Sequence, residues 1–217
     1  MKRRFAYLHG FASSHKSTKG QRLQSIFKDY GVELELPDLN APSFSRLSIT
    51  AMLARLDQLF DDASPLSLIG SSMGGYLAAR WAEQNPGRVD RLLLLCPGFG
   101  LNTRWPDLIG RDAFENWQTS GWHPFPNGAG ILEKVHFGLI EDALTHPPYP
   151  KATCPTTIIH GDQDETVPVE TSKIYVQNYP AVDLKIVDDD HRLTNSIDMI
   201  ATTALTCLGI SEGFGLP

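Results

Sequence analysis

The sequence predicts an α/β fold in which a mostly parallel sheet is covered by helices on both faces. Short apolar runs alternate with helical patterns along most of the 217 residues. Strands separated by helices of about 10–15 residues join through right-handed crossovers into a parallel sheet. The run Arg91–Cys96 contains four consecutive leucines, which is typical of a strand buried on both faces. A chain of this length fits one domain.

The periodicity of apolar residues predicts the individual elements. Within Thr18–Tyr30, for example, apolar and aromatic residues recur at spacings of three and four, as on one face of a helix. They are Leu23, Ile26, Phe27 and Tyr30. The expected strands are Phe5–His9, Val32–Leu36, Leu66–Ile69, Arg91–Cys96, Thr156–His160 and Leu184–Val187. The expected helices are Thr18–Tyr30, Ser48–Phe60, Gly74–Asn85, Val169–Gln177 and Leu193–Leu208.

Residues 98–150 break this alternation. The segment has no clear strand and is punctuated by Gly, Pro and Asn, notably at Pro124–Gly130. We therefore predict a short helical cap insertion over one end of the sheet, within a single domain of residues 1–217. Its aromatic residues would form either an apolar roof over a substrate or only the core of the insertion itself. They include Trp105, Phe114, Trp117, Trp122, Phe125 and Phe137.

Composition argues against several classes of protein. The formal net charge is −6 without a basic stripe, so nucleic acid is not expected as a partner. No apolar run approaches the ~20 residues that span a bilayer. The apolar start is too short for a signal peptide, and we expect a cytoplasmic protein without a membrane partner. The three cysteines lack zinc spacing, which predicts reduced thiols and no metal site. A homodimer is left open.

The strongest chemical signal is the turn Gly70-Ser71-Ser72-Met73-Gly74, which fits the pattern Gly-x-Ser-x-Gly. A predicted strand runs into this turn and an Ala-rich helix leaves it, as a nucleophile elbow requires. Ser72 would sit at a strained φ/ψ on a very tight turn, where the flanking positions leave no room for side chains. Gly70 and Gly74 meet that condition. The alternative is an ordinary Gly-rich turn between a strand and a helix.

A serine hydroxyl needs a base to take its proton, and the base needs an acid to orient it. Three carboxylates follow the strand Thr156–His160, at Asp162, Asp164 and Glu165. We prefer Asp164, because it lies further out on the loop, where it can reach across the strand ends. Asp162 is expected to fix the turn by bonding nearby backbone amides, and Glu165 to be a solvated charge.

Two further segments complete a site. His191 follows the last predicted strand, which places it at the same edge of the sheet as Ser72 and Asp164. A surface histidine is the alternative. The loop His9-Gly10-Phe11 follows the first strand, so the backbone amides of Phe11 and Met73 would hold a developing oxyanion. Gly10 lets this main chain approach closely, and the His9 imidazole is expected to pack under the loop without a catalytic role.

Together these motifs resemble the α/β-hydrolase superfamily. They are His-Gly-Phe at 9–11, Gly-Ser-Ser-Met-Gly-Gly at 70–75, His-Gly-Asp-Gln-Asp-Glu-Thr-Val-Pro at 160–168 and Asp-His-Arg-Leu at 190–193. Within the superfamily the chain is similar to small bacterial serine esterases and thioesterase-like hydrolases with a minimal cap. The resemblance extends from residue 5 to about 208. It implies an α/β-hydrolase fold, with Ser72 as nucleophile, Asp164 as acid, His191 as base, and the amides of Phe11 and Met73 as oxyanion donors.

The expected function is a serine hydrolase that cleaves carboxylic esters with short to medium acyl or aryl groups, through an acyl-enzyme and without a cofactor. The aromatic insertion lacks a clustered basic site for phosphate or coenzyme A, which favours a small-molecule ester over an acyl-CoA. Thioesterase, acyltransferase or other chemistry on the same residues stays open, because this fold hosts many reactions. A non-catalytic binding protein is the less favoured alternative, since a binder has no need for the complete set of residues.

Overall fold

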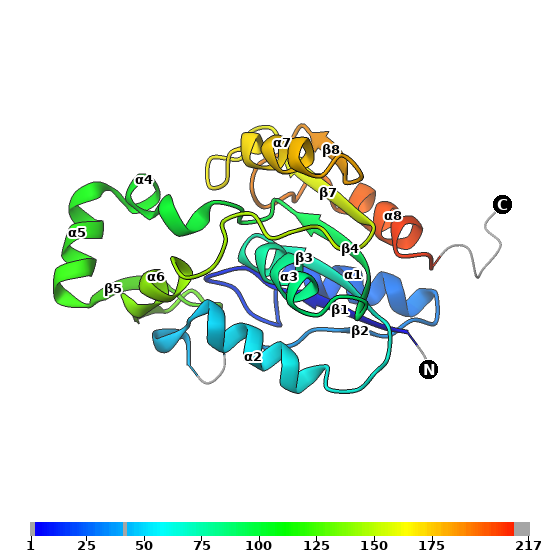
Figure 1. Cartoon of the computed structure of the whole chain (residues 1–217), viewed down its shortest axis with the longest axis horizontal. Coiled ribbons are helices and arrows are strands. Elements are labelled where there is room, and N and C mark those ends of the chain that lie inside the picture. The colour runs from blue at the N-terminus through cyan, green and yellow to red at the C-terminus, as the bar shows by residue number, and fades with distance from the viewer. Residues whose placement is uncertain (1–2, 41–42, 211–217) are drawn as a thin grey trace.

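The computed structural model describes residues 3–40 and 43–210, and its centre is the predicted parallel sheet (Figure 1). Six strands lie in the order β2-β1-β3-β4-β7-β8, and every neighbouring pair is parallel. The strands are β1 (Arg4–Leu8), β2 (Leu34–Glu35), β3 (Leu66–Ser71), β4 (Val89–Leu95), β7 (Thr156–Gly161) and β8 (Asp183–Val187). The fold class expected from the sequence is therefore confirmed.

Helices cover both faces of the sheet, because alternate residues of each central strand point to opposite sides. In β4, Leu92 and Leu94 belong to one hydrophobic cluster, whereas Leu93 and Leu95 belong to the other. The first cluster includes side chains of α2 (Ile49–Leu59), α3 (Met73–Gln84) and α7 (Val169–Asn178), and the second those of α1 (Thr18–Asp29) and α8 (Ile197–Cys207). A leucine run without polar alternation is what such a doubly covered strand requires.

The segment between β4 and β7 is partly helical, as expected. It contains the short 3-10 helix η2 (Leu101–Thr103), α4 (Trp105–Ile109), α5 (Arg111–Ser120) and α6 (Gly138–Ala143). These helices gather at the end of the molecule away from the chain termini (Figure 1). Buried side chains of the segment, Trp105 and Trp117 among them, join the same hydrophobic cluster as α2 and α3.

The insertion also contains an antiparallel hairpin that the sequence did not indicate, formed by β5 (Trp122–Pro126) and β6 (Leu132–His136). Its first strand carries Pro124 and Pro126, which pair with Lys134 and Leu132. Proline has no N–H to donate to a ladder, so it reads as a break in a strand. A two-stranded ribbon tolerates it because both strands are edges.

Two expected boundaries also move. The strand expected over Val32–Leu36 is reduced to Leu34–Glu35. The helix expected from Leu193 begins only at Ile197, because Leu193 has a φ of 54°, which no α-helical residue adopts. The described part of the chain has no helix with both the length and the apolar character needed to cross a membrane.

The order of the strands creates a crevice beside Ser72. β1 has β2 on one side and β3 on the other, so the chain leaves β1 in one direction and later returns to its opposite side. Crevices of this kind open at the carboxyl ends of the strands, where ligands bind in open α/β sheets. The loop after β1 and the turn after β3, which carry Gly10 and Ser72, meet at this point.

Candidate active site

Ser72 stands alone between two elements, since β3 ends at Ser71 and α3 begins at Met73. Its φ of 54° and ψ of −120° lie outside the favoured regions for residues with a side chain. The glycines around it are needed for close packing. A Cβ on Gly70 would lie 2.4 Å from the carbonyl oxygen of Gly74, and one on Gly74 would lie 2.1 Å from that of Leu8. The turn is thus held between β1 and its own helix.

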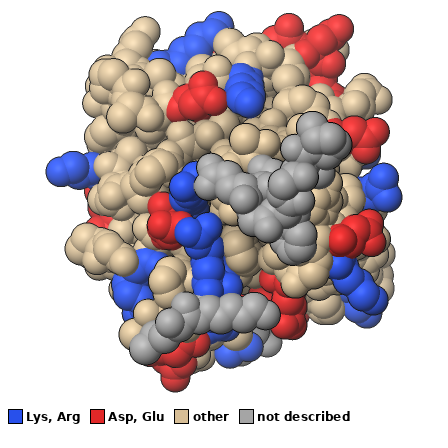
Figure 2. Space-filling view, turned by 90° about the vertical axis from the view of Figure 1, so that its right-hand side faces the viewer, with Lys and Arg blue, Asp and Glu red and all other residues tan. Residues whose placement is uncertain are grey.

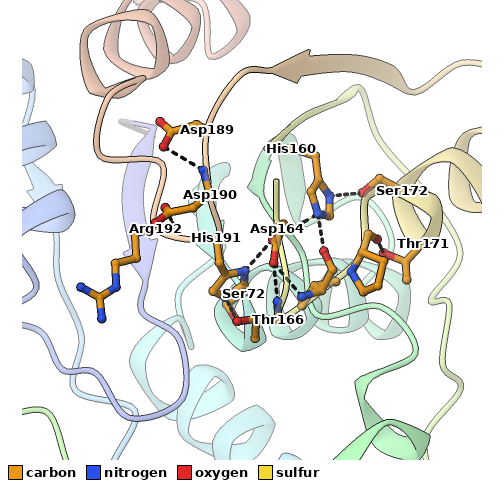
Figure 3. Close-up of polar contacts among 12 residues, drawn as sticks. Ser72, His160, Asp164, Thr166, Thr171, Ser172, Asp189, Asp190, His191 and Arg192 are labelled. Carbon is orange, nitrogen blue, oxygen red and sulfur yellow. Dashed lines mark hydrogen bonds and ion pairs between the residues drawn. The ribbon is translucent and has the colours of Figure 1, made fainter. Parts of the chain in front are cut away.

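A row of hydrogen bonds joins three residues that are far apart in the sequence (Figure 3). Ser72 Oγ lies 3.0 Å from His191 Nε2, and His191 Nδ1 lies 2.6 Å from Asp164 Oδ2. They follow β3, β8 and β7, whose carboxyl ends meet at one edge of the sheet because the strands are parallel. The structure therefore brings together the serine, histidine and aspartate that the sequence singled out.

Only one of the three competing carboxylates faces His191. The Asp164 side chain is fully buried, whereas Asp162 and Glu165 are exposed. Our expectation that Asp162 bonds the nearby amides is wrong, because its side chain forms no hydrogen bond within the described ranges. Asp164 fixes the turn instead, because its Oδ1 accepts hydrogen bonds from the amides of Thr166 at 2.9 Å and Val167 at 2.7 Å. These two bonds fix the carboxylate so that its other oxygen points at His191.

His160 also belongs to the site, although its position in the sequence indicated no role there. It is completely buried, and its Nε2 lies 2.8 Å from the carbonyl oxygen of Val167 and 3.2 Å from Asp164 Oδ2. A carbonyl only accepts, so Nε2 carries a proton and donates to both oxygens. Nδ1 faces the hydroxyl of Ser172 at 2.7 Å. Asp164 thus receives two imidazole donors, one from His191 and one from His160.

These donors determine the charge of Asp164. Burial alone would raise the pKa of the carboxyl, but hydrogen bonds from His160 and His191 and from the amide of Val167 outweigh it and hold the pKa well below its usual range. The carboxylate is therefore ionised at neutral pH. Only an ionised carboxylate can stabilise a positive imidazolium beside it.

Two backbone amides near Ser72 are free to donate. Neither the amide of Phe11 nor that of Met73 bonds to an acceptor among the described residues. The loop after β1 passes directly over the serine, since a Cβ on Gly10 would lie 3.1 Å from Ser72 Cβ. A larger residue than glycine would push this loop away. Unpaired amides beside a serine hydroxyl are the donors that an oxyanion needs.

His9 supports this loop and does not reach the serine. It is buried, its Nδ1 bonds the carbonyl oxygen of Gly10 at 2.9 Å, and its Nε2 accepts the amide of Leu39 at 3.1 Å. This pattern matches the packing role expected for His9. Asp38, nearby, accepts the amide of Asn40 at 2.9 Å and forms a turn. Burial lowers the pKa of His9, although the Gly10 carbonyl and the Asp38 carboxylate oppose the shift.

This shift predicts a loss of stability in weak acid. The pKa of His9 is lower in the folded chain than its usual 6.5, so the unfolded chain binds the proton more readily. The contribution is complete above the unfolded pKa and is lost as the pH falls towards the folded value. Between pH 7 and pH 5 we expect the free energy of unfolding to fall by on the order of 1 kcal/mol more in wild type than in His9→Asn. Urea unfolding at both pH values measures this.

The matched control for His9 is His15→Asn, which changes a more exposed imidazole on the same loop. It should follow the wild type at both pH values. An equal acid-induced loss in His9→Asn and wild type would contradict the prediction.

Two cavities lie beside the turn that carries Ser72 and Met73. An apolar pocket is lined by residues of α2, α3, α6 and the start of the insertion, including Met73, Leu101 and Trp105. A second, polar cavity is lined by Ser72, His191 and the loop after β1. The structure places the aromatic side chains of the insertion in two surroundings. Trp117 and Phe125 are buried in its core, whereas Trp105 also faces the apolar pocket.

One group of metal-ligating side chains occurs in the described part of the chain, formed by Cys96, His160 and Asp164, with ligand atoms within 4.8 Å of one another. Its donors suit hydrogen bonding better than a metal ion. His160 Nε2 is protonated, Asp164 is occupied by its four donors, and burial raises the pKa of the Cys96 thiol. Metal ligands must instead be deprotonated.

Comparison with known proteins gives this site a context. A family model described as an uncharacterised protein family, UPF0227, matches residues 4–204. The mitochondrial palmitoyl-protein thioesterase ABHD10 of Bos taurus is 25% identical over 211 residues, which cover 89% of this chain and 68% of that protein. The human protein of the same name is 27% identical over 157 residues, covering 68% of this chain and 50% of that protein.

Solved structures share the fold. Alpha/beta hydrolase domain-containing protein 10 from mouse has a TM-score of 0.72 at 20% identity, and the match covers 94% of this chain and 89% of that one. Est1E from Butyrivibrio proteoclasticus has a TM-score of 0.76 at 20% identity, with 96% and 89% covered. These similarities confirm that the sheet and its helices form the α/β-hydrolase fold expected from the sequence.

Proposed function

The chain belongs to the uncharacterised protein family UPF0227 and is an α/β hydrolase, and from this premise we propose that it is a serine hydrolase of carboxylic esters. One observation carries the proposal. Ser72, held at a strained turn, is hydrogen-bonded to His191, which is hydrogen-bonded to the buried Asp164. Acyl transfer requires a serine that is activated by a base, and a base that is oriented by an acid.

The geometry supports a definite sequence of steps. His191 Nε2 takes the proton of Ser72 as Oγ bonds to the ester carbonyl carbon, and the amides of Phe11 and Met73 hold the oxyanion. The carbon–oxygen bond to the alcohol breaks, and the alcohol leaves with the proton from His191. Water then attacks the acyl-enzyme in the same manner, releasing the acid and Ser72. Each oxyanion donor typically contributes ~2.7–4 kcal/mol to lowering the barrier.

The substrate follows less directly from the site. The apolar pocket beside Met73 and Trp105 measures about 20 Å³, which suits a small acyl group such as acetyl. Thioester hydrolysis is the second candidate, because the ABHD10 relatives are named palmitoyl-protein thioesterases. Both reactions would use Ser72 in the same way and differ only in the atom that leaves.

Hydrolysis of neutral p-nitrophenyl esters of rising chain length, with matched thioesters alongside, tests the proposal. We expect measurable hydrolysis with an optimum at one chain length, and covalent labelling of Ser72 by a fluorophosphonate that an ester substrate slows. If the folded protein hydrolyses none of these substrates and Ser72 stays unlabelled, the proposal is wrong. The ratio of ester to thioester rates decides between the two candidates.

His160 should act as a positioning residue in this reaction. His160→Asn shortens the side chain and withdraws the second imidazole donor from Asp164, whose pKa should then rise. We expect kcat to fall about tenfold with little change in KM, since a hydrogen bond to a charged group contributes roughly 1.5–3 kcal/mol. The acid limb of the pH–rate profile should also move upward in pH. Steady-state kinetics across the acid range measure both effects.

Ser172→Ala is the comparison for this change, because it removes only the hydroxyl that faces His160 Nδ1. It should produce a smaller effect of the same kind. A loss of stability in His160→Asn without any change in the pH profile would mean that His160 has only a packing role.

A further inference from the structure

The polar cavity beside Ser72 has a basic lining. It measures about 670 Å³ and extends from Ser72 and His191 to the loop after β1 and the beginning of α1. Lys16, Lys19 and Arg192 line it, and no Asp or Glu occurs among the described residues of its lining. A cavity lined by three positively charged side chains is unexpected in a chain with 25 acidic and 19 basic residues. The three residues come from separate segments of the sequence, and only the fold brings them together.

None of these cations is paired with a carboxylate in the part of the chain that the structure describes. Other arginines do find partners: Arg3 lies 2.9 Å from Asp90 and Arg4 lies 2.8 Å from Glu35. On the face drawn in Figure 2, Lys and Arg side chains likewise lie next to Asp and Glu side chains. The cavity is thus a place where positive charge is left without a counterion from the protein.

Lys19 is the most deeply placed of the three. It is half-buried, and its ammonium donates to Ser71 Oγ at 3.2 Å, one residue before the nucleophile. Burial lowers the pKa of Lys19, although the carboxylates of Asp189 and Asp190 act to raise it. An ammonium removed from water in this way would be stabilised by an anion bound beside it.

Arg192 joins the lining of the cavity from the loop after β8. Its backbone amide donates to Asp190 Oδ1 at 2.7 Å, and its side chain extends away from Asp164 and His160 (Figure 3). The guanidinium presents a planar fork of N–H donors that matches the oxygens of a carboxylate or a phosphate. Lys16 is exposed at the rim and adds a third positive charge.

We propose that this cavity binds an anionic group of the substrate, a carboxylate or a phosphate, through Lys16, Lys19 and Arg192. The inference rests on the proposed ester hydrolysis and specifies its substrate. The apolar pocket and the basic cavity both adjoin the turn at Ser72. An ester with its apolar acyl group in one and an anion on its leaving group in the other would place the carbonyl carbon between them, at Ser72.

Three acetate esters test this proposal. Their leaving groups are 4-hydroxybenzamide, which is neutral, 4-hydroxybenzoate, which carries a carboxylate, and 4-hydroxyphenyl phosphate. We expect kcat/KM for at least one anionic ester to exceed that for the neutral ester at least tenfold, and the preference to shrink as ionic strength rises. The anion that is preferred identifies the group the cavity binds.

The double variant Lys16→Gln/Arg192→Gln provides the decisive comparison, because in the described structure neither side chain is hydrogen-bonded to the turn at Ser72, whereas Lys19 is bonded to Ser71. It should lose at least tenfold in kcat/KM for the preferred anionic ester and less than twofold for the neutral one. Lys19→Gln should also reduce the ratio of anionic to neutral kcat/KM, although the loss of its bond to Ser71 should lower the neutral rate as well, and Lys19→Arg should restore part of that ratio. Lys28→Gln, which removes a charge at the far end of the same helix, should change neither rate.

Equal losses for neutral and anionic esters in the double variant, or a wild type without preference for either anion, would overturn this inference and leave the ester hydrolase standing. Absence of both neutral-ester hydrolysis and Ser72 labelling would overturn the hydrolase and this inference with it.

Discussion

Ser72→Ala should lower kcat/KM for the best ester substrate by about 10⁶-fold, as loss of the nucleophile does where serine and histidine act as a unit. This corresponds to about 8 kcal/mol of transition-state stabilisation. The fold should survive, because two backbone hydrogen bonds hold Ser72: its amide donates to the carbonyl oxygen of Leu95, and its carbonyl oxygen accepts from the amide of Gly98. Among the described residues, the lost Oγ is hydrogen-bonded only to His191. Hydrolysis kinetics and fluorophosphonate labelling, which should vanish, measure the effect.

Ser67→Ala is the matched control for this variant. Ser67 lies on the same strand, β3, is fully buried, and its hydroxyl has no hydrogen-bond partner in the described structure. Its removal should leave activity and labelling within twofold of wild type. Residual activity in Ser72→Ala above about one-hundredth of wild type would show that another group attacks the ester.

The parts of the site that local sequence determines could be predicted. A tight turn between a strand and a helix leaves few choices around Ser72, and parallel strands must present their loops at one edge. These rules place Ser72, Asp164 and His191 together without any knowledge of side-chain contacts. They also favoured Asp164 over Asp162, although the structure supplies the physical reason, which is that Asp164 alone is buried and held by backbone amides.

The parts that depend on distant contacts could not be predicted. His160 ends a strand and looks like a core histidine until Ser172, on the following helix, is seen to bond its Nδ1. Lys19 and Arg192 are ordinary surface residues in the sequence, and only the packing of α1 beside the loop after β8 gathers them. Residues such as Pro124 concealed a strand, because proline is a breaking signal everywhere except at an edge.

Asp164→Asn should lower kcat by about 10⁴-fold through the proton on His191, as replacing the acid of a serine triad can do. The amides of Thr166 and Val167 donate to one carboxylate oxygen, so the asparagine side chain must turn its own oxygen towards them. Its NH₂ group then faces His191 Nδ1, which has to accept. The proton moves to Nε2, where it blocks transfer from Ser72.

The same NH₂ group also meets the proton on His160 Nε2, which lies 3.2 Å from the present carboxylate oxygen. Two donors facing each other in a buried site leave both unsatisfied, so the free energy of unfolding should fall by about 1–3 kcal/mol. Asp162→Asn is the matched control, because its exposed side chain bonds nothing in the described structure, and it should remain within twofold of wild type. Kinetics and urea unfolding of the two variants side by side test both effects. A larger loss of kcat in Asp162→Asn than in Asp164→Asn would show that Asp162 is the acid. A loss of stability without a loss of kcat in Asp164→Asn would mean that the buried charge stabilises the fold and does not orient His191.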